Sequence, residues 1–500
     1  MTNEAGEVSG ASGPTSVEAM AGDGHRVCTT SGGREACNAD GNGRGPLERD
    51  QTNGVSKLII FNVKYSQNLG DGVIAQCLEH ELGQALGGAE IVSIDLAGRD
   101  AWTDPGTGRL RLLKLAVLRS LPGLAKDQIT AFALGRILGR LRPHWESRVR
   151  GANVALVGGG QLIQDVDLNF PLKLSAAFDI CRAERVPMGV VAVGVSAPEP
   201  GNRLGGDLLR NVLTSDLVCV AARDQASCDN LAKRGRPGAE ICLDPGLLAS
   251  RLWPVAPTKR LSGRPIVGLG VTHGSVLSHH SARTGPVRAV DAKLFADLAL
   301  GLAWNGFDVH CFTNGAGEDM EMLAQVSALL DGPRDTSLER FPMKWKPVRR
   351  KKMRQNKKLE RRSGSVRSEH SLDAAGTIRV LTRPQDPQQL ARMIAGFDAV
   401  VAHRLHASIV AYSYRTPIIG LAWDKKVDAF FQSVGLGRFV CAFGPESLDD
   451  VLALTHEAME QGVEPVRHQD VLETCAENIR SVAAQVVANA GQSQCIHAAA

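Results

Sequence analysis

The chain has 500 residues, of which 43% are hydrophobic and 22% charged, and its formal net charge is +4. This length predicts two or three domains, and the composition is typical of a soluble globular protein. No apolar run approaches the roughly 20 residues that a membrane-spanning helix needs, and no basic start followed by an apolar stretch indicates a secretory signal. The 11 cysteines form no CxxC pair and no zinc-ligand spacing, which predicts reduced thiols, a cytoplasmic location and no metal site.

Residues 1–55 are rich in Gly, Ser, Ala, Asn and Asp, and we predict a disordered tail there because such a segment buries little apolar surface. Order is expected to start with a buried parallel strand at 57–63. The turn Gly70-Asp71-Gly72 then leads into an amphipathic helix over 73–86. Strand, glycine turn and helix predict the start of a βαβ unit.

The alternation of strands and helices continues to residue 440. Within 56–250, an N-terminal Rossmann-like domain, further strands are expected at 152–157, 186–195 and 217–221, with a helix at 227–233. Prolines in 250–265 indicate a linker. Within 265–440, a C-terminal Rossmann-like domain, strands are expected at 265–271, 307–312, 378–381, 399–402 and 416–421, with helices at 289–304 and 386–394. Closing helices and a tail follow over 441–500. This pattern predicts an α/β fold with two Rossmann-like domains facing a cleft.

The positive charge is concentrated in one segment. Residues 344–367, within an insertion over 335–375, hold 12 Lys or Arg against one acid, Glu360, so the rest of the chain is mildly acidic. The segment is interpreted either as a solvated loop or as a peripheral contact with anionic lipid at the inner face of the membrane, worth about 1 kcal/mol per basic residue. Nucleic acid is a less favoured partner, because no fold that binds it presents these residues.

Two glycine-rich turns follow predicted strands, where ligands of open α/β sheets bind. Backbone N–H groups at Gly70, Gly159 and Gly160 could approach an anion, or these glycines could only permit tight turns. Asp71 could bind a sugar hydroxyl or cap a helix. Beyond the second turn, Gln161 and Asp165 could reach the cleft.

The segment Ala402-His403-Arg404-Leu405-His406 ends a predicted strand and begins a predicted helix. An arginine there suits a phosphate or carboxylate, and a histidine beside it suits proton transfer. A structural role for the histidines stays open.

Two further charged pairs follow predicted strands. Arg223-Asp224 could bind an anion or form a salt bridge, and Lys425 of Trp423-Asp424-Lys425-Lys426 could hold an anion or be solvated surface.

Taken together, the motifs resemble the polysaccharide pyruvyl transferase family. The matching segments, spread over 57–437, are Asn68-Leu69-Gly70-Asp71, Val157-Gly158-Gly159-Gly160, Arg223-Asp224, Asp244-Pro245-Gly246-Leu247, the stretch from Phe312 to Asp319, Arg404-Leu405-His406, Pro417 and Trp423-Asp424-Lys425-Lys426. Their order and spacing carry the resemblance, since each motif is weak alone.

The resemblance implies the two-domain shape of GT-B glycosyltransferases and transfer of pyruvate from phosphoenolpyruvate, with no cofactor, to a sugar of an exopolysaccharide or cell-surface glycan, free or lipid-linked. It implies that Arg404 and His406 contact phosphoenolpyruvate and that Arg223 holds its anionic groups. Because forming the ketal needs a proton at the methylene carbon, His406 is the expected general acid, with His403 in reserve. Arg223, Arg404 and Lys425 would stabilise the departing phosphate.

Two other interpretations stay open. One is a glycosyltransferase of the same shape that uses a nucleotide-sugar. The other is a catalytically silent relative that tethers an assembly through 344–367. Retention of Arg223, Arg404 and His406 disfavours the silent relative.

Overall fold

The computed structural model describes residues 54–103, 123–256, 263–275, 290–331 and 376–498. All described residues belong to one compact unit, Gln51–Ala500. Apart from residues 54 and 55, the predicted tail lies outside the described residues, as does the basic segment 344–367. Both interpretations of that segment therefore stay predictions.

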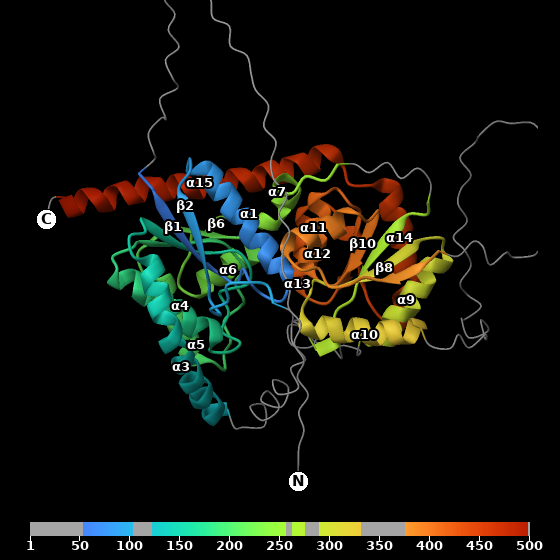
Figure 1. Cartoon of the computed structure of the whole chain (residues 1–500), viewed down its shortest axis with the longest axis horizontal. Coiled ribbons are helices and arrows are strands. Elements are labelled where there is room, and N and C mark those ends of the chain that lie inside the picture. The colour runs from blue at the N-terminus through green and yellow to red at the C-terminus, as the bar shows by residue number, and fades with distance from the viewer. Residues whose placement is uncertain (1–53, 104–122, 257–262, 276–289, 332–375, 499–500) are drawn as a thin grey trace, which may run out of the picture. The chain divides into compact units, whose positions relative to one another are not determined.

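The first half of the described chain forms a six-stranded parallel sheet in the order β2-β1-β3-β4-β5-β6 (Figure 1). Its strands are β1 (Lys57–Asn62), β2 (Glu90–Asp95), β3 (Val154–Gly158), β4 (Met188–Val193), β5 (Leu217–Ala222) and β6 (Glu240–Ile241). Strand β1 is buried on both faces: Leu58 and Ile60 join one hydrophobic cluster, and Ile59 and Phe61 join another. A strand buried on both faces explains the unbroken apolar run in the sequence.

The second half forms another six-stranded parallel sheet, in the order β12-β11-β10-β7-β8-β9. Its strands are β7 (Ile266–Gly270), β8 (Asp308–Phe312), β9 (Ile378–Val380), β10 (Ala399–Ala402), β11 (Ile418–Ala422) and β12 (Val440–Ala442). Counted from β7, this is the Rossmann strand order, in which the direction of winding reverses between β7 and β10. The two sheets confirm the predicted α/β fold with two Rossmann-like parts.

Helices connect successive strands of each sheet. Those of the first half are α1 (Leu69–Ala85), α3 (Gly123–Val149), α4 (Asn169–Ala183), α5 (Arg203–Leu213) and α6 (Gln225–Lys233). Those of the second half are α9 (Ala292–Trp304), α10 (Gly317–Asp331), α11 (Pro387–Ala395), α12 (Leu405–Ser413) and α13 (Lys425–Ser433). Helix α14 (Leu448–Gln461) follows the last strand, β12.

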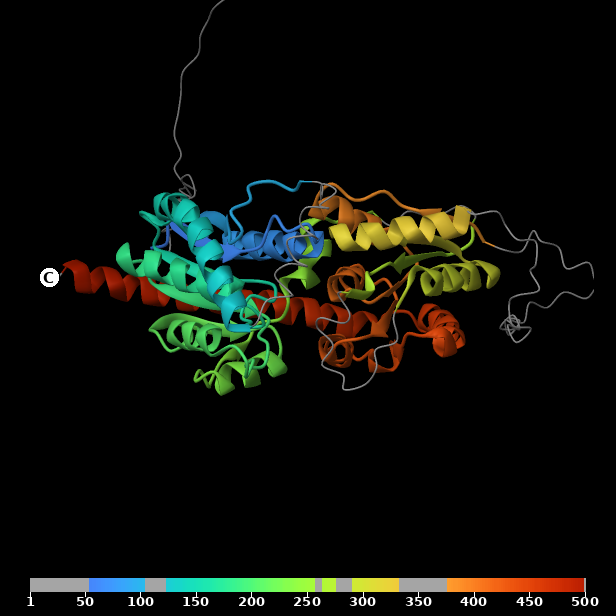
Figure 2. The same cartoon turned by 90° about the horizontal axis from the view of Figure 1, so that it is seen from below.

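The halves are joined twice along the chain. The short helices η1 (Pro245–Leu248) and α7 (Ala249–Leu252) occupy the start of the predicted linker. The last helix, α15 (Pro465–Ala498), returns to the first sheet (Figures 1 and 2). There Asn489 Nδ2 donates to Val218 O at 3.1 Å, and Leu243 N donates to Asn478 Oδ1 at 3.2 Å. Because Gln51–Ala500 is one compact unit, the domain boundary at 250–265 stays a prediction.

The prediction of a turn at Gly70-Asp71-Gly72 before helix α1 is wrong. The helix begins at Leu69, so Gly70 and Gly72 lie in its first turn. A Cβ on Gly70 would lie 2.6 Å from His406 Cβ, and one on Gly72 would lie 2.6 Å from Pro387 Cγ. The missing side chains of Gly70 and Gly72 let α1 pack closely against α12 and α11, and these glycines do not change the direction of the chain.

Candidate active site

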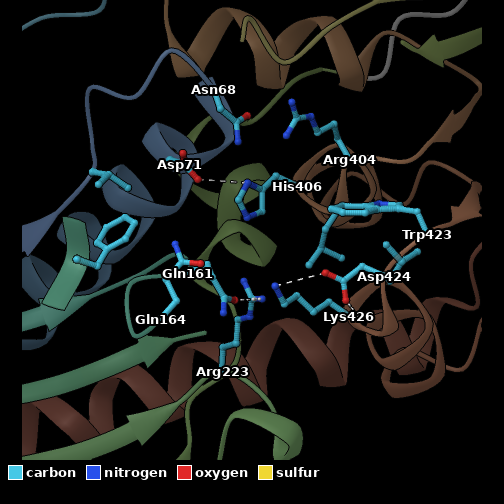
Figure 3. Close-up of a pocket in the computed structure, with 14 residues that line it drawn as sticks. Asn68, Asp71, Gln161, Gln164, Arg223, Arg404, His406, Trp423, Asp424 and Lys426 are labelled. Carbon is cyan, nitrogen blue, oxygen red and sulfur yellow. Dashed lines mark hydrogen bonds and ion pairs between the residues drawn. The ribbon is translucent and has the colours of Figure 1, made fainter. Parts of the chain in front are cut away.

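A cavity of about 260 Å³, the first cavity, lies where strands of both sheets end (Figure 3). Its walls come from residues that follow β1, β3 and β5 of the first sheet and β10 and β11 of the second. They are Val63, Asn68, Asp71, Gln161, Gln164, Phe170, Arg223, Arg404, Leu405, His406, Trp423, Asp424, Lys426 and Val427. This is the edge at which open parallel sheets bind ligands.

Arg404 occupies the N-cap position of α12 and is held by a buried carboxylate. Its Nε donates to Asp319 Oδ2 at 2.8 Å, and Nη2 lies 2.7 Å from the same oxygen. The other oxygen of Asp319 accepts a hydrogen bond from His273 N at 2.9 Å. Burial raises the pKa of Asp319, and the Arg404 guanidinium opposes that shift. The carboxylate thus fixes the direction in which Arg404 enters the cavity.

His406, in the first turn of α12, faces Asp71 of α1. His406 Nδ1 lies 3.6 Å from Asp71 Oδ1, a pair drawn with a dashed line in Figure 3. Burial, with the nearby charges of Arg223, Arg404 and Lys426, lowers the pKa of His406 to about 3. Burial raises the pKa of Asp71 to about 6. With such a low pKa the imidazole is neutral at pH 7 in the free protein. The role of His406 as general acid stays a prediction.

Arg223, directly after β5, is buried among acceptors. Its Nε donates to Asp224 Oδ2 at 3.2 Å, Nη2 donates to Gln161 Oε1 at 3.1 Å, and Nη1 lies 3.7 Å from Asp244 Oδ2. The predicted salt bridge with Asp224 is present, and Arg223 also lines the cavity. Gly194 makes room for this arrangement, because a Cβ there would lie 2.9 Å from Arg223 Cζ.

The lysine that lines the cavity is Lys426, not the predicted Lys425. Lys425 is the first residue of α13 and is exposed. Lys426 Nζ lies 3.4 Å from Asp424 Oδ2, and burial is the main cause of its lowered pKa. The prediction missed by one residue because it took the position after the strand without the direction that the helix gives each side chain.

The reserve acid, His403, lies outside the cavity. It is 1% exposed and packs edge-on against Phe295 and Phe443, with ring centroids 5.7 and 5.0 Å apart. Burial lowers its pKa to about 3. His403 directly follows strand β10 and belongs to the core, so this structure does not place it where a reserve acid would reach the cavity.

The glycines after β3 shape the chain but do not line the cavity. Gly159 and Gly160 have φ angles of +70° and +77°, a conformation that glycine adopts without strain. Gly159 N donates to Val191 O at 3.1 Å, so this amide is already occupied. Gln161 reaches the cavity as expected, whereas Asp165 forms a buried pair with Arg234, with Nη2 to Oδ1 at 2.7 Å.

Three residues that support the site were not predicted as site residues: Asp244, Asp319 and Lys426. Asp244 and Asp319 stand in segments singled out as family matches, and that is the signal that could have found them. Within the described residues, no group of three or more His, Cys, Asp or Glu side chains could hold a metal ion. No described helix has the length and apolarity to cross a membrane.

Solved structures with a similar fold share little sequence with this chain. A UDP-GlcNAc 2-epimerase from Neisseria meningitidis bound to UDP-GlcNAc is 11% identical, with 87% of this chain and 99% of that chain covered and a TM-score of 0.45. An α,α-trehalose 6-phosphate synthase from Burkholderia multivorans is 11% identical, with 89% and 99% covered and a TM-score of 0.45. A UDP-GlcNAc 2-epimerase from Methanocaldococcus jannaschii with UDP-GlcNAc and UDP is 10% identical, with 80% and 92% covered and a TM-score of 0.43. None of these likenesses bears on activity.

The family comparison is more specific. Among curated proteins, none matches the sequence significantly. Residues 68–425 match the polysaccharide pyruvyl transferase family, a span that runs from Asn68 at one end of the cavity to the start of α13. The chain therefore belongs to the polysaccharide pyruvyl transferases, a family of transferases.

Proposed function

We propose that this protein transfers pyruvate from phosphoenolpyruvate to two hydroxyls of a glycan sugar and forms a pyruvate ketal. One observation carries the proposal. Arg223, Arg404 and Lys426 line a single cavity that also contains the His406–Asp71 pair. A cavity with three cations and a proton-carrying pair suits a small donor with two anionic groups that must be protonated during the reaction.

The positions of the cations suit the two anionic groups of phosphoenolpyruvate. Arg223 and Lys426 approach one another at one end of the cavity, and Arg404 lies at the other end with Asn68 (Figure 3). We assign the phosphate to Arg223 and Lys426, and the carboxylate to Arg404, whose planar guanidinium can bind it with two hydrogen bonds. Two anchors would fix C2 and C3 of the donor between them.

The chemistry balances with these groups alone. C3 of the enol accepts a proton while a sugar hydroxyl adds to C2. The C2–O bond to phosphate then breaks, with Arg223 and Lys426 stabilising the charge of the leaving group. A second hydroxyl adds to C2 and completes the ketal. Of the two hydroxyl protons released, one replaces the proton given to C3 and the other leaves with phosphate.

The proton for C3 is assigned to the Asp71–His406 pair rather than to His406 alone. With a pKa of about 6, Asp71 holds a proton in part of the molecules near neutral pH. A bound dianion favours the charged imidazolium, because an opposite charge nearby raises the pKa of a histidine. Binding of the donor would therefore draw a proton onto His406 where it is needed.

The test is phosphate release from phosphoenolpyruvate in the presence of methyl glycosides, with the organic product followed by proton NMR. We expect one ketal methyl group to appear for each phosphate released. Phosphate release with free pyruvate as the only organic product would mean simple hydrolysis and would contradict the transfer. Turnover of a UDP-sugar instead, with phosphoenolpyruvate inert, would favour the glycosyltransferase alternative.

A further inference from the structure

A second cavity of about 500 Å³ adjoins the first. The two share Arg223, Leu405 and Lys426 as lining residues, so these side chains form the boundary between them. Arg223 and Lys426 lie at one end of the first cavity (Figure 3), and because both also line the second cavity, the second adjoins that end. The volume lies within the range of about 300–1,000 Å³ that is usual for small-molecule sites.

Most walls of the second cavity are apolar, and they come from both halves of the chain. The apolar lining residues are Ala226, Ile241, Leu243, Leu247, Leu405, Ile409, Ala429, Phe430, Val434 and Val471. Gln225, Gln432 and Ser433 add polar groups. A site with apolar walls and a few polar groups suits a ligand that has both kinds of surface.

One residue that lines this cavity, Asp244, has a side-chain oxygen without a hydrogen bond. Asp244 is 6% exposed, and its Oδ1 accepts a hydrogen bond from Gly246 N at 3.0 Å. Its Oδ2 is buried and accepts none. Arg223 Nη1, at 3.7 Å, is too distant for a direct hydrogen bond. A buried carboxylate oxygen in this position costs free energy until a donor reaches it.

We propose that the second cavity is the acceptor site, in which a sugar hydroxyl donates a hydrogen bond to Asp244 Oδ2. The inference rests on the proposed function, because it places the acceptor beside the anions of the donor. A purely apolar ligand would leave Asp244 Oδ2 without a partner, and an anionic group would offer it no hydrogen-bond donor. A neutral sugar supplies hydroxyl donors for the carboxylate and C–H faces for Phe430 and Ile409.

The raised pKa of Asp244, caused mainly by burial and opposed by Arg223, agrees with a carboxyl group short of hydrogen-bond donors. Its position across Arg223 from the first cavity gives the carboxylate a second effect. Asp244 reduces the positive charge that Arg223 presents to the donor. Removal of that negative charge should therefore weaken binding of the sugar but not of phosphoenolpyruvate.

The experiment measures two affinities in the full chain. Methyl glycosides of glucose, galactose, mannose and N-acetylglucosamine are titrated by saturation-transfer NMR in the presence of phosphoenolpyruvate, and phosphoenolpyruvate itself is titrated by calorimetry. For Asp244→Asn we expect roughly a 10- to 100-fold loss of glycoside affinity, as for a lost hydrogen bond to a charged group. Phosphoenolpyruvate should bind as tightly as before or more tightly. Asp207→Asn, an exposed carboxylate on α5, is the matched control and should change neither affinity.

A second variant keeps the test decisive if Asp244→Asn unfolds. Ala429→Phe adds a ring to the wall of the second cavity on α13 and should abolish glycoside binding while phosphoenolpyruvate still binds. Glycoside binding that persists in the variants, or no binding of any of the four glycosides to the wild type while phosphoenolpyruvate binds, would overturn the acceptor site. Absence of phosphoenolpyruvate binding in the wild type would overturn the proposed function instead.

Discussion

The two strand-to-helix turns that carry the arginines of the first cavity differ in their surroundings. In the β5–α6 turn, the side chain of Arg223 is 5% exposed and lies between Asp224 and Asp244. In the β10–α12 turn, the side chain of Arg404 is 16% exposed, and His406, two residues later, faces a carboxylate of the other half. The first turn is an enclosed ion cluster suited to holding an anion. The second combines a cation with a group that can carry a proton, so changes in the two turns should affect different steps.

The largest effect is expected from His406→Gln in the β10–α12 turn. It should lower kcat by about 10²–10⁴-fold, the usual contribution of an acid–base group, with phosphoenolpyruvate affinity within about threefold of wild type. Steady-state kinetics and calorimetry separate the two quantities. His144→Gln, on an exposed part of α3, is the control. If His406→Gln instead lost phosphoenolpyruvate affinity by a similar factor and kept its kcat, the proposed difference between the two turns would be contradicted.

Arg223→Gln in the β5–α6 turn should act mainly on binding. Loss of one charged hydrogen-bond donor is worth about 1.5–3 kcal/mol, so we expect phosphoenolpyruvate to bind roughly 10- to 100-fold more weakly by calorimetry. Arg210→Gln, whose side chain is 62% exposed on α5, should bind normally. Because Arg223→Gln leaves Asp244 without its cation, the unfolding midpoint must be measured alongside. Unchanged affinity in a folded variant would assign the phosphate to other groups.

His403, also in the β10–α12 turn, should affect how the free energy of unfolding depends on pH. Its pKa is about 3 in the folded protein against 6.5 for a free histidine, so between these values the unfolded chain binds a proton that the folded chain does not. Stability should therefore fall as the pH drops below 6.5, by about 2 kcal/mol from this residue between pH 7 and pH 5. In His403→Phe this part of the decrease in unfolding free energy at low pH should be absent, as measured by urea unfolding curves. An unchanged pH dependence would show that His403 is not buried in its neutral form.

The smallest effect is expected where α1 meets the β10–α12 turn. Gly70→Ala would favour the helix by about 1 kcal/mol in an exposed position, but its Cβ would lie 2.6 Å from His406 Cβ. We expect about a tenfold loss of kcat/KM, because the methyl group displaces His406 from Asp71. Gly83→Ala, in the same helix, should keep full activity, because its added methyl group would meet only Ile91 Cγ1, at an ordinary contact distance of 3.8 Å. Equal activity of the two variants would contradict a fixed His406 position.

The alternation of apolar strands and amphipathic helices was enough to predict both sheets, because each parallel strand is buried and reads as a short apolar run. The edge strands β2 and β6 of the first sheet and β12 of the second were not predicted. Strand β2 begins with exposed Glu90, and β6, at the other edge of the first sheet, has two exposed residues. Edge strands carry less of the apolar signal on which the prediction depends.

The candidate site was predictable only as far as chain position determines it. Arg223, Arg404 and His406 follow strands directly, and the ends of parallel strands share one edge of a sheet. The partners that fix them lie far away in sequence: Asp319 is 85 residues from Arg404, and Asp71 belongs to the other half. The direction of each side chain could not be predicted from the sequence either. His403 and Lys425 were therefore expected in the site, whereas His403 faces the core and Lys425 faces the solvent.

The most direct test of the account is a calorimetric titration of phosphoenolpyruvate at low salt into wild type and Arg404→Ala. We expect saturable binding at one site per chain, weakened at least tenfold in the variant because the carboxylate loses its guanidinium partner. Absence of binding to the wild type, together with saturable binding of UDP-GlcNAc, would contradict it and assign the cavity to a nucleotide-sugar.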